Sequence, residues 1–310
     1  MDLYEEDLYE KDDIKEYSED INPVDIGKWL SYMPYHNEDQ KSLQRSNLIS
    51  VPIANHYGEI SFILSTYIND MEKYLEHISK EISIENSETI LNTEVYYTSK
   101  LEGSHTTLKR TFEIHNGSKI DENDKFSESM IKGNFEAVKL LNVYGNRINE
   151  EILYKVWDVL TTDCRNNTEI QGSLYRTGEV GVTNSDFIAV SVSDIKEHMD
   201  RFFDFYHSNI LNDKPFIKAC IIHFAFETIH PFSDGNGRLG RLLMNNFLIS
   251  QNIESCRAVS FSMYIDKNRG LYDNAFIQSE NEYSDCTPFL EYMLDTMAQA
   301  YSACKELQNK

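Results

Sequence analysis

Apolar residues recur every three or four positions along much of the chain, which is the spacing of one face of an α-helix. Four stretches have this spacing and predict amphipathic helices: residues 60–75, 90–101, 152–160 and 195–203. No proline occurs between residues 53 and 214, so no pyrrolidine ring interrupts these helices. We therefore expect a mainly helical protein in which each of these helices buries one face.

A further helix is expected over residues 216–229, which read FIKACIIHFAFETI and are apolar on nearly every side. A helix of this kind is usually buried at the centre of a fold, so we interpret His223 within it as a core histidine. Asn212 or Asp213 is expected to cap this helix, with Pro215 in its first turn. Apolar spacing resumes over residues 242–248, which predicts a helix, a tight loop and a second helix.

One segment departs from the helical pattern. Two short β-type runs surround a turn-forming Thr-Asn-Ser-Asp sequence: Glu179, Val180, Gly181 and Val182 before it, and residues 187–190 after it. They predict a small β-hairpin, with an irregular loop as the alternative. A two-stranded hairpin is only marginally stable alone, so we expect it to act as a mobile flap. The expected fold class is all-α with one small β-hairpin flap.

The composition excludes several classes of protein. Of the 310 residues, 41% are hydrophobic, which is enough for a sizeable core and excludes global disorder. The 29 basic and 51 acidic side chains give a net charge of −22. This balance argues against binding to nucleic acid or to an anionic membrane, because both surfaces attract clustered Lys and Arg.

The cysteines and the N-terminus indicate a cytoplasmic protein. The five cysteines are at least 18 residues apart, so there is no Cys-x-x-Cys motif, and the odd, scattered set indicates reduced thiols. The N-terminus lacks the pattern of a signal peptide, and no apolar run reaches the ~18 residues of a membrane span. Residues 1–20 contain ten acidic side chains and predict a mobile or partly helical leader.

The loop between the two central helices carries the chemistry. Three of the chain's 13 glycines lie at positions 235, 237 and 240, where they let the backbone approach a ligand closely. The loop leads into a helix N-terminus, which favours an anion, and Arg238 and Arg241 add two cations suited to phosphate. Asp234 suits Mg²⁺, and His230 suits a general base near neutral pH. Together these residues predict phosphoryl or nucleotidyl transfer.

Residues 230–241 resemble the signature of the Fic family, His-x-Phe-x-Asp/Glu-Gly-Asn-Gly-Arg-x-x-Arg, and match every position of it. The similarity extends over roughly residues 130–300, through the lead-in 226–229 and the later segments 264–275 and 287–294. Members of this family usually transfer AMP from ATP to a Ser, Thr or Tyr hydroxyl of a protein. The resemblance therefore implies ATP as co-substrate and a protein as target.

The resemblance also implies a role for each matched residue. His230 would deprotonate the target hydroxyl, and Asp234 would hold Mg²⁺ that bridges the phosphates. The anion hole for the α-phosphate would be formed by Gly235, Asn236 and Gly237, and the outer phosphates would be contacted by Arg238 and Arg241. Phe232 would be a buried anchor beneath the loop, and Tyr272 would lie beside adenine. A flap that pairs with the target would be formed by Glu179, Val180, Gly181 and Val182.

A second motif lies upstream. Gly103 is a natural helix stop, which places Glu102 at a helix C-terminus where the dipole disfavours a carboxylate, and Thr98 lies one turn earlier on the same face. Thr98, Glu102 and Gly103 resemble the inhibitory motif Ser/Thr-x-x-x-Glu-Gly/Asn of Fic proteins with an N-terminal inhibitory helix. The resemblance implies that Glu102 pairs with Arg241 in place of the ATP γ-phosphate, and that Thr98 braces Glu102.

The leading hypothesis is an autoinhibited protein adenylyltransferase that modifies a protein target and itself, with dimerisation as a further expectation. The alternatives are a Fic enzyme that removes AMP or transfers phosphate or phosphocholine, and a non-catalytic module that senses nucleotide. The expected organisation is an N-terminal helical region over residues 1–125 with the inhibitory helix, a Fic core over 126–250 and C-terminal helices over 251–310.

Overall fold

The computed structural model describes residues 48–165, 174–180, 188–279 and 284–309. From Ile49 onward these residues belong to one folded unit. The acidic leader expected at residues 1–20 lies outside the described residues, as do Gly181 and Val182 of the expected flap. Among the helices of the described part, none has the length and apolar character that crossing a membrane requires.

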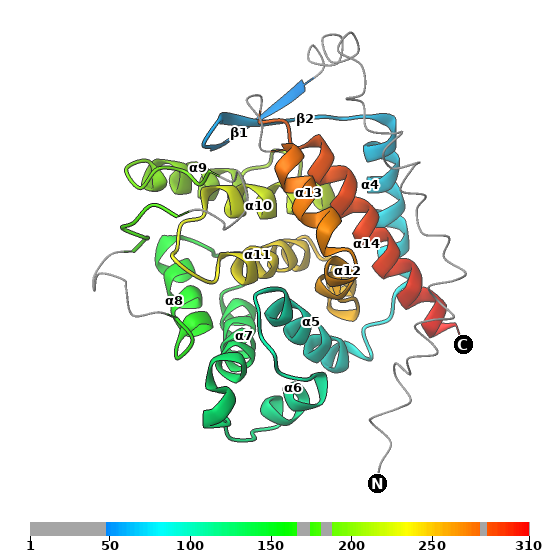
Figure 1. The fold of residues 1–310 in the computed structure, drawn as a ribbon. Coiled ribbons are helices and arrows are strands. Elements are labelled where there is room, and N and C mark those ends of the chain that lie inside the picture. The colour runs from blue at the N-terminus through cyan, green and yellow to red at the C-terminus, as the bar shows by residue number, and fades with distance from the viewer. Residues whose placement is uncertain (1–47, 166–173, 181–187, 280–283, 310) are drawn as a thin grey trace. The chain divides into compact units, whose positions relative to one another are not determined.

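The described chain is mainly helical, as expected (Figure 1). It begins with strands β1 (Leu48–Asn55) and β2 (Gly58–Ile63) and continues through helices α4 (Thr66–Ile78), α5 (Ser87–Leu101), α6 (Leu108–His115), α7 (Lys125–Tyr144), α8 (Glu150–Thr161), α9 (Ile195–His207), α10 (Pro215–Ile229), α11 (Asn236–Ser250), α12 (Phe261–Lys267), α13 (Arg269–Ser279) and α14 (Thr287–Gln308). Short 3-10 turns are η2 (Ser79–Glu81), η3 (Glu122–Asp124) and η4 (Glu254–Ala258).

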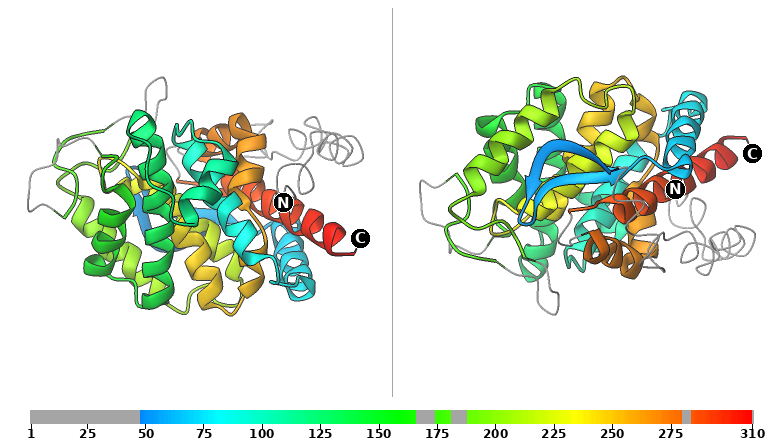
Figure 2. Two further views of the ribbon diagram at one scale, coloured as in Figure 1. Left: turned by 90° about the horizontal axis from the view of Figure 1, so that it is seen from below. Right: turned by 90° about the horizontal axis from the view of Figure 1, so that it is seen from above.

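Helix α10 is the buried centre of the fold, as its apolar sequence predicts. It packs against α11, α9, α14 and α4, and α11 in turn contacts α5 and α7. In Figure 1, α10 and α11 therefore run through the middle of the unit, with α5 to α7 on one side of them. Figure 2 brings α6 and α7 to the front when seen from below and the strand pair to the front when seen from above. His223 is fully buried in α10, as expected of a core histidine.

The expected cap of α10 is wrong. The N-cap residue is Lys214, without a side-chain hydrogen bond to the helix. Both oxygens of the buried Glu72 carboxylate, from α4, instead accept hydrogen bonds from the first free amides, at 3.0 Å from Phe216 N and 2.7 Å from Ile217 N. Burial raises the pKa of Glu72 to about 7. The start of α10 is therefore capped by a carboxylate from a distant helix, and not by Asn212 or Asp213 as the local sequence predicted.

The strands lie elsewhere than expected. Residues 60–63, which the apolar spacing assigned to a helix, form β2, and the helix begins at Thr66 after the Ser65 cap. Pairing explains this outcome, because β2 pairs with β1 in a two-stranded sheet. In addition, Ser61 N donates to Ser284 O (2.9 Å) and Cys286 N donates to Ser61 O (2.8 Å). These bonds tie β2 to the chain just before α14. Glu179 and Val180, from the expected flap, are not in a strand.

Candidate functional site

The loop between α10 and α11 has an unusual backbone at both of its ends. His230 ends α10 in a left-handed conformation, with φ 52° and ψ 59°. Gly235 precedes α11 with φ 82°, a conformation that glycine adopts without strain. A left-handed residue that is not glycine is uncommon and is often found at functional sites. The turn at His230 directs the chain sharply away from α10 into the loop.

Three side chains hold the loop in place through ring stacking and hydrogen bonds. Phe232 is 1% exposed and stacks on Trp157 of α8, with ring centroids 4.6 Å apart and planes 9° apart. Trp157 Nε1 donates to Asp234 O at 2.9 Å. The Asn236 side chain closes the loop on itself, since its Oδ1 accepts from Phe232 N (3.0 Å) and its Nδ2 donates to Phe232 O (2.8 Å). The expectation that Phe232 is a buried anchor is confirmed.

The imidazole of His230 is kept neutral. Its Nδ1 lies 3.3 Å from Glu227 O. Burial is the main cause that lowers the pKa of His230 to about 4, and the nearby Arg176 charge acts in the same direction. A neutral imidazole is the form that can accept a proton from a hydroxyl, so at pH 7 this side chain is ready to act as a base.

Arg176 is a residue that the sequence reasoning missed. Its buried guanidinium donates from Nε to His230 O at 2.8 Å, from Nη1 to Gly178 O at 2.9 Å and from Nη2 to Val190 O. Its own amide N donates to Pro231 O at 2.9 Å. Arg176 thus joins the loop to the two segments, 174–180 and 188–190, that flank the expected flap. Sequence reasoning missed this arginine because two of its acceptors, His230 O and Val190 O, are backbone carbonyls of other segments.

Glu102 lies in the anion cradle, the space between the first turn of α11 at Gly237 and the guanidinium of Arg241. Helix α5 ends at Leu101, and Glu102 and the left-handed Gly103 (φ 90°) follow it. The Glu102 carboxylate accepts a hydrogen bond from Arg241 Nη2 at 2.7 Å and lies directly against Gly237, in the first turn of α11. Burial alone would raise the pKa of Glu102, but the Arg241 charge and hydrogen bond hold this pKa below its usual value. The carboxylate is therefore an anion that is paired with Arg241 and lies beside the first turn of α11.

Thr98 contacts Arg241 rather than Glu102. Arg241 Nε donates to Thr98 Oγ1 at 2.8 Å, and Arg241 Nη2 donates to Thr98 O at 3.3 Å. The expectation that Thr98 braces Glu102 directly is therefore corrected. Threonine orients the guanidinium, and the guanidinium orients the carboxylate. Thr98 and Glu102 therefore both contact Arg241, and the pair of Glu102 with Arg241 is the one that the family resemblance implied.

Arg238 and Asp234 form a second pair beneath the loop. The Arg238 side chain is fully buried, with Nη2 3.5 Å from Asp234 Oδ1 and Nη1 3.4 Å from Leu160 O. The Asp234 side chain is 38% exposed, and no cluster of three metal-ligating side chains occurs in the described ranges. One accessible carboxylate beside an anion cradle nevertheless fits Mg²⁺, which often takes its other ligands from phosphates and water.

Tyr272 joins the site through α13. Its hydroxyl lies 2.8 Å from His223 Nε2, and burial raises its pKa well above the usual value. Glu227, one turn before His230, is also buried, and burial raises its pKa to about 8. Both groups are therefore neutral at pH 7, next to the charged Arg241. The expected position of Tyr272 beside adenine stays a prediction.

Known proteins that resemble this chain include a family whose model matches the part that contains the loop. Residues 147–248 match the model of the Fic/DOC family. The chain is 28% identical to "Protein adenylyltransferase Fic" of Drosophila willistoni over 211 residues, which is 65% of this chain and 39% of the relative. It is 26% identical to the protein of the same name from Aedes aegypti over 284 residues, which is 86% of this chain and 51% of the relative. The matches thus cover about half or less of these relatives.

Solved structures show the same fold. A Fic family protein from Desulfovibrio desulfuricans aligns with a TM-score of 0.68 and 18% identity, over 80% of this chain and 77% of that protein. Fic-1 from C. elegans aligns with a TM-score of 0.60 and 18% identity, over 78% and 71%. At this identity the likeness concerns the fold alone.

Proposed function

We propose that this chain, in which residues 147–248 form a Fic/DOC family domain, transfers AMP from ATP to a hydroxyl group of a protein and is held inactive by Glu102. The contact that carries this proposal is the 2.7 Å bond between Glu102 and Arg241 beside Gly237. An internal carboxylate already uses the cation and the helix N-terminus that a phosphate needs. These contacts support an anion site at the loop, and the anion there in this structure is the Glu102 carboxylate.

In the active form, the backbone amides of Gly235, Asn236 and Gly237 bind the α-phosphate, since the first amides of a helix lack partners within the helix. Arg241, released from Glu102, binds the outer phosphates. Arg238 adds its charge from beneath the loop, where it also orients Asp234. Asp234 would hold Mg²⁺, and the metal would neutralise phosphate charge there. Tyr272 lies beside the base.

The chemical step is an in-line displacement. The target hydroxyl oxygen attacks the α-phosphorus, its proton passes to the neutral His230 imidazole, and the bond to pyrophosphate breaks. At pH 7 the His230 imidazole is unprotonated and can accept this proton. The flap residues Glu179, Val180, Gly181 and Val182 align the target segment, and Arg176 fixes the flap ends to the loop.

Labelled ATP tests the proposal. Glu102→Gly should raise the transfer of labelled AMP to proteins of a lysate, and to the chain itself, at least about tenfold, the gain expected when ~1.4 kcal/mol of inhibitory contact is lost. His230→Ala in the Glu102→Gly background should abolish it, and Glu102→Gln, which keeps the size but not the charge, should give an intermediate rate. Equal incorporation by Glu102→Gly and its His230→Ala derivative would refute the assignment. The modified residue, whether Ser, Thr or Tyr, is read by mass spectrometry.

Removal of AMP is the second candidate, because the Glu102 carboxylate lies beside Gly237, at the end of the catalytic loop. A carboxylate there can also position a water molecule. A target that loses AMP only when Glu102 is present supports removal, whereas a gain in mass of AMP in the Glu102→Gly variant supports transfer. A gain of phosphate or phosphocholine would identify the other family chemistries, and ATP binding without turnover would identify a sensing module.

A further inference from the structure

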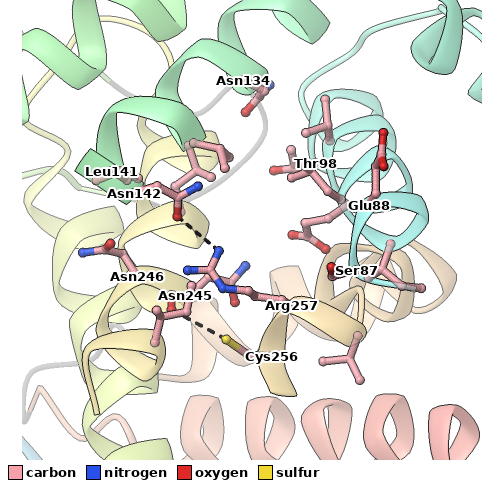
Figure 3. Close-up of a pocket in the computed structure, with 18 of the residues that line it drawn as sticks. Ser87, Glu88, Thr98, Asn134, Leu141, Asn142, Asn245, Asn246, Cys256 and Arg257 are labelled. Carbon is pink, nitrogen blue, oxygen red and sulfur yellow. Dashed lines mark hydrogen bonds between the residues drawn. The ribbon is translucent and has the colours of Figure 1, made fainter. Parts of the chain in front are cut away.

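The docked position of α5 depends on more than its contacts with the loop. On the side that faces α7, α11 and the turn η4, this helix borders a cavity of about 360 Å³. Figure 3 shows the labelled residues of α5 on one side of this cavity and those of α7 and α11 on the other. Atoms that line a cavity make fewer packing contacts than atoms of a solid core. Contacts with other neighbours must therefore help to hold α5 in place.

Glu94 of α5 caps α12, a helix against which α5 packs. Its carboxylate accepts hydrogen bonds from Ser262 N at 3.0 Å, from Ser260 Oγ at 2.8 Å and from Ser262 Oγ. Ser260 is the N-cap residue of α12, and its own Oγ accepts from Met263 N at 3.3 Å. A local serine and a carboxylate from α5 thus share the free amides in the first turn of α12. The start of α12 is therefore built in part from α5.

Two contacts at the end of α5 reach the same part of the chain. Lys100 Nζ lies 2.7 Å from Asp266 Oδ2 of α12. Arg269 Nη1, from the start of α13, donates to O of Leu101, the last residue of α5, at 2.5 Å. The Lys100 and Arg269 side chains are 45% and 55% exposed, so water weakens both contacts. Glu94 is less exposed and accepts three hydrogen bonds, so it contributes the largest share of this attachment.

Glu94, Thr98 and Glu102 follow one another at intervals of four residues, which places them at successive turns along one side of α5 and its C-cap. Glu94 contacts α12, whereas Thr98 and Glu102 both contact Arg241 of α11. Because a helix moves as a stiff unit, a shift of α5 that takes Glu102 out of the anion cradle also breaks the bonds of Glu94 to α12. The Glu94 cap and the position of Glu102 are therefore coupled.

We propose that Glu94 is a positioning residue of the inhibition: by capping α12 it fixes α5 where Glu102 fills the anion cradle. The inhibitory meaning of this inference rests on the proposed function. Glu94 acts on the nucleotide site only through α5. Loss of the cap shifts the population toward chains in which α5 is displaced and the cradle can bind a phosphate. By linkage, ATP binding becomes tighter when the cap is removed.

Amide hydrogen exchange on the full chain measures this attachment without any catalytic activity. In Glu94→Ala, which removes all three acceptors, the amides of residues 95–101 should exchange at least about tenfold faster than in the wild type, while those of α10 keep their rates. Glu88→Ala is the matched control, because Glu88 is an exposed residue in the first turn of the same helix, and residues 95–101 should exchange there as in the wild type. Unchanged exchange of residues 95–101 in Glu94→Ala would overturn the attachment.

ATP binding separates a positioning role from a merely structural one. By calorimetry, Glu94→Ala should bind ATP about fivefold more tightly than the wild type, or tighter still. In the Glu102→Gly background the same substitution should leave the ATP affinity unchanged, because no carboxylate remains to be positioned. Loosening of α12 and α13 alone would weaken ATP binding in both backgrounds. Such a weakening, or an equal gain in both backgrounds, would refute the positioning role.

Ser262→Ala is a second and milder variant. It removes one donor to Glu94 and leaves the carboxylate and the Ser260 cap in place. Its ATP affinity should rise by a smaller factor than that of Glu94→Ala, and this variant decides the question if Glu94→Ala does not fold. An affinity equal to or below that of the wild type would count against the inference. If Glu102→Gly transfers no AMP, the proposed function fails, while the exchange measurement still decides whether Glu94 holds α5.

Discussion

The carboxylate of Glu102 fills the space that a side chain at position 237 would need. A β-carbon built on Gly237 would lie 2.2 Å from Glu102 Oε1 and 3.3 Å from Arg241 Nη1. The absent side chain of Gly237 thus makes room for an anion between the first turn of α11 and the guanidinium. Under the proposed function, a phosphate group needs this same room, so it and Glu102 cannot be bound together.

Gly237→Ala tests whether that space binds a phosphate. In the Glu102→Gly background, the added methyl group should weaken ATP binding at least about tenfold, because it occupies the position of closest approach. Gly270→Ala in α13 is the matched control, since a β-carbon there meets nothing within 4 Å. Titration calorimetry with ATP measures both variants. Unchanged ATP affinity in Gly237→Ala would show that the phosphates bind elsewhere.

Thr98→Val should release the inhibition in part. The substitution keeps the shape of the side chain but removes the acceptor of Arg241 Nε, which lies 2.8 Å from Thr98 Oγ1. Leaving a buried donor unpaired costs about 1–3 kcal/mol in the inhibited form, so ATP affinity should rise roughly 5- to 150-fold. Thr98→Ser retains the hydroxyl and should behave like the wild type. A Thr98→Val protein with wild-type ATP affinity would disprove a role for this bond.

The pH profile should reflect the environment of His230. Because burial lowers its pKa to about 4, the imidazole remains a base well below the ~6.5 of an ordinary histidine. In Glu102→Gly, kcat/KM for AMP transfer should therefore stay level from pH 8 to about pH 5 and fall only at lower pH, as the free enzyme takes up a proton. Initial rates in a series of buffers measure this, and half-maximal activity near pH 6.5 would contradict it.

The helices around the site are predictable from local sequence because their causes are local. Pro215 and the apolar run fix the start of α10, and Gly235 with the following apolar spacing fixes the start of α11. Gly103 ends the α5 segment, which places Glu102 where the motif requires it. The convergence of Glu102 with Arg241 followed from the family resemblance, because no pattern within either segment reports the other.

The features that sequence reasoning missed depend on distant partners. Ile60 fits a helical stripe, yet it lies in β2, which pairs with β1 and is also bridged at Ser61 to the chain near residue 285, more than 200 residues later. Glu72 resembles any polar residue of α4 until the fold brings it to the start of α10. Arg176 lies among polar neighbours in sequence, and its three acceptors are carbonyl groups that carry no side-chain signal.

Glu72→Gln should destabilise the fold. Both carboxylate oxygens accept amide hydrogen bonds at the start of α10, and glutamine offers one acceptor and one donor in their place. We expect a loss of about 1–3 kcal/mol in the free energy of unfolding in urea. Glu76→Gln, one turn later in α4, is the control and should change it by less than about 0.5 kcal/mol. Equal stability of the two variants would exclude the capping role.

Glu72 should also make stability depend on pH. Its folded pKa of about 7 lies above the ordinary value of 4.5, so between these values the folded chain binds more protons than the unfolded chain. Its contribution to stability is therefore full below pH 4.5 and is lost as the pH rises through 7. The difference in unfolding free energy between wild type and Glu72→Gln should shrink from pH 5 to pH 8, and a difference that grows over this range would contradict the raised pKa.

The stack of Phe232 on Trp157 and the bonds between Asn236 and Phe232 hold the catalytic loop without any contribution from α5. Under the proposed function, activation therefore requires only that α5 move, because the loop is held by contacts that do not involve this helix. On that proposal, the change is reversible, because α5 can return to a surface that has kept its form.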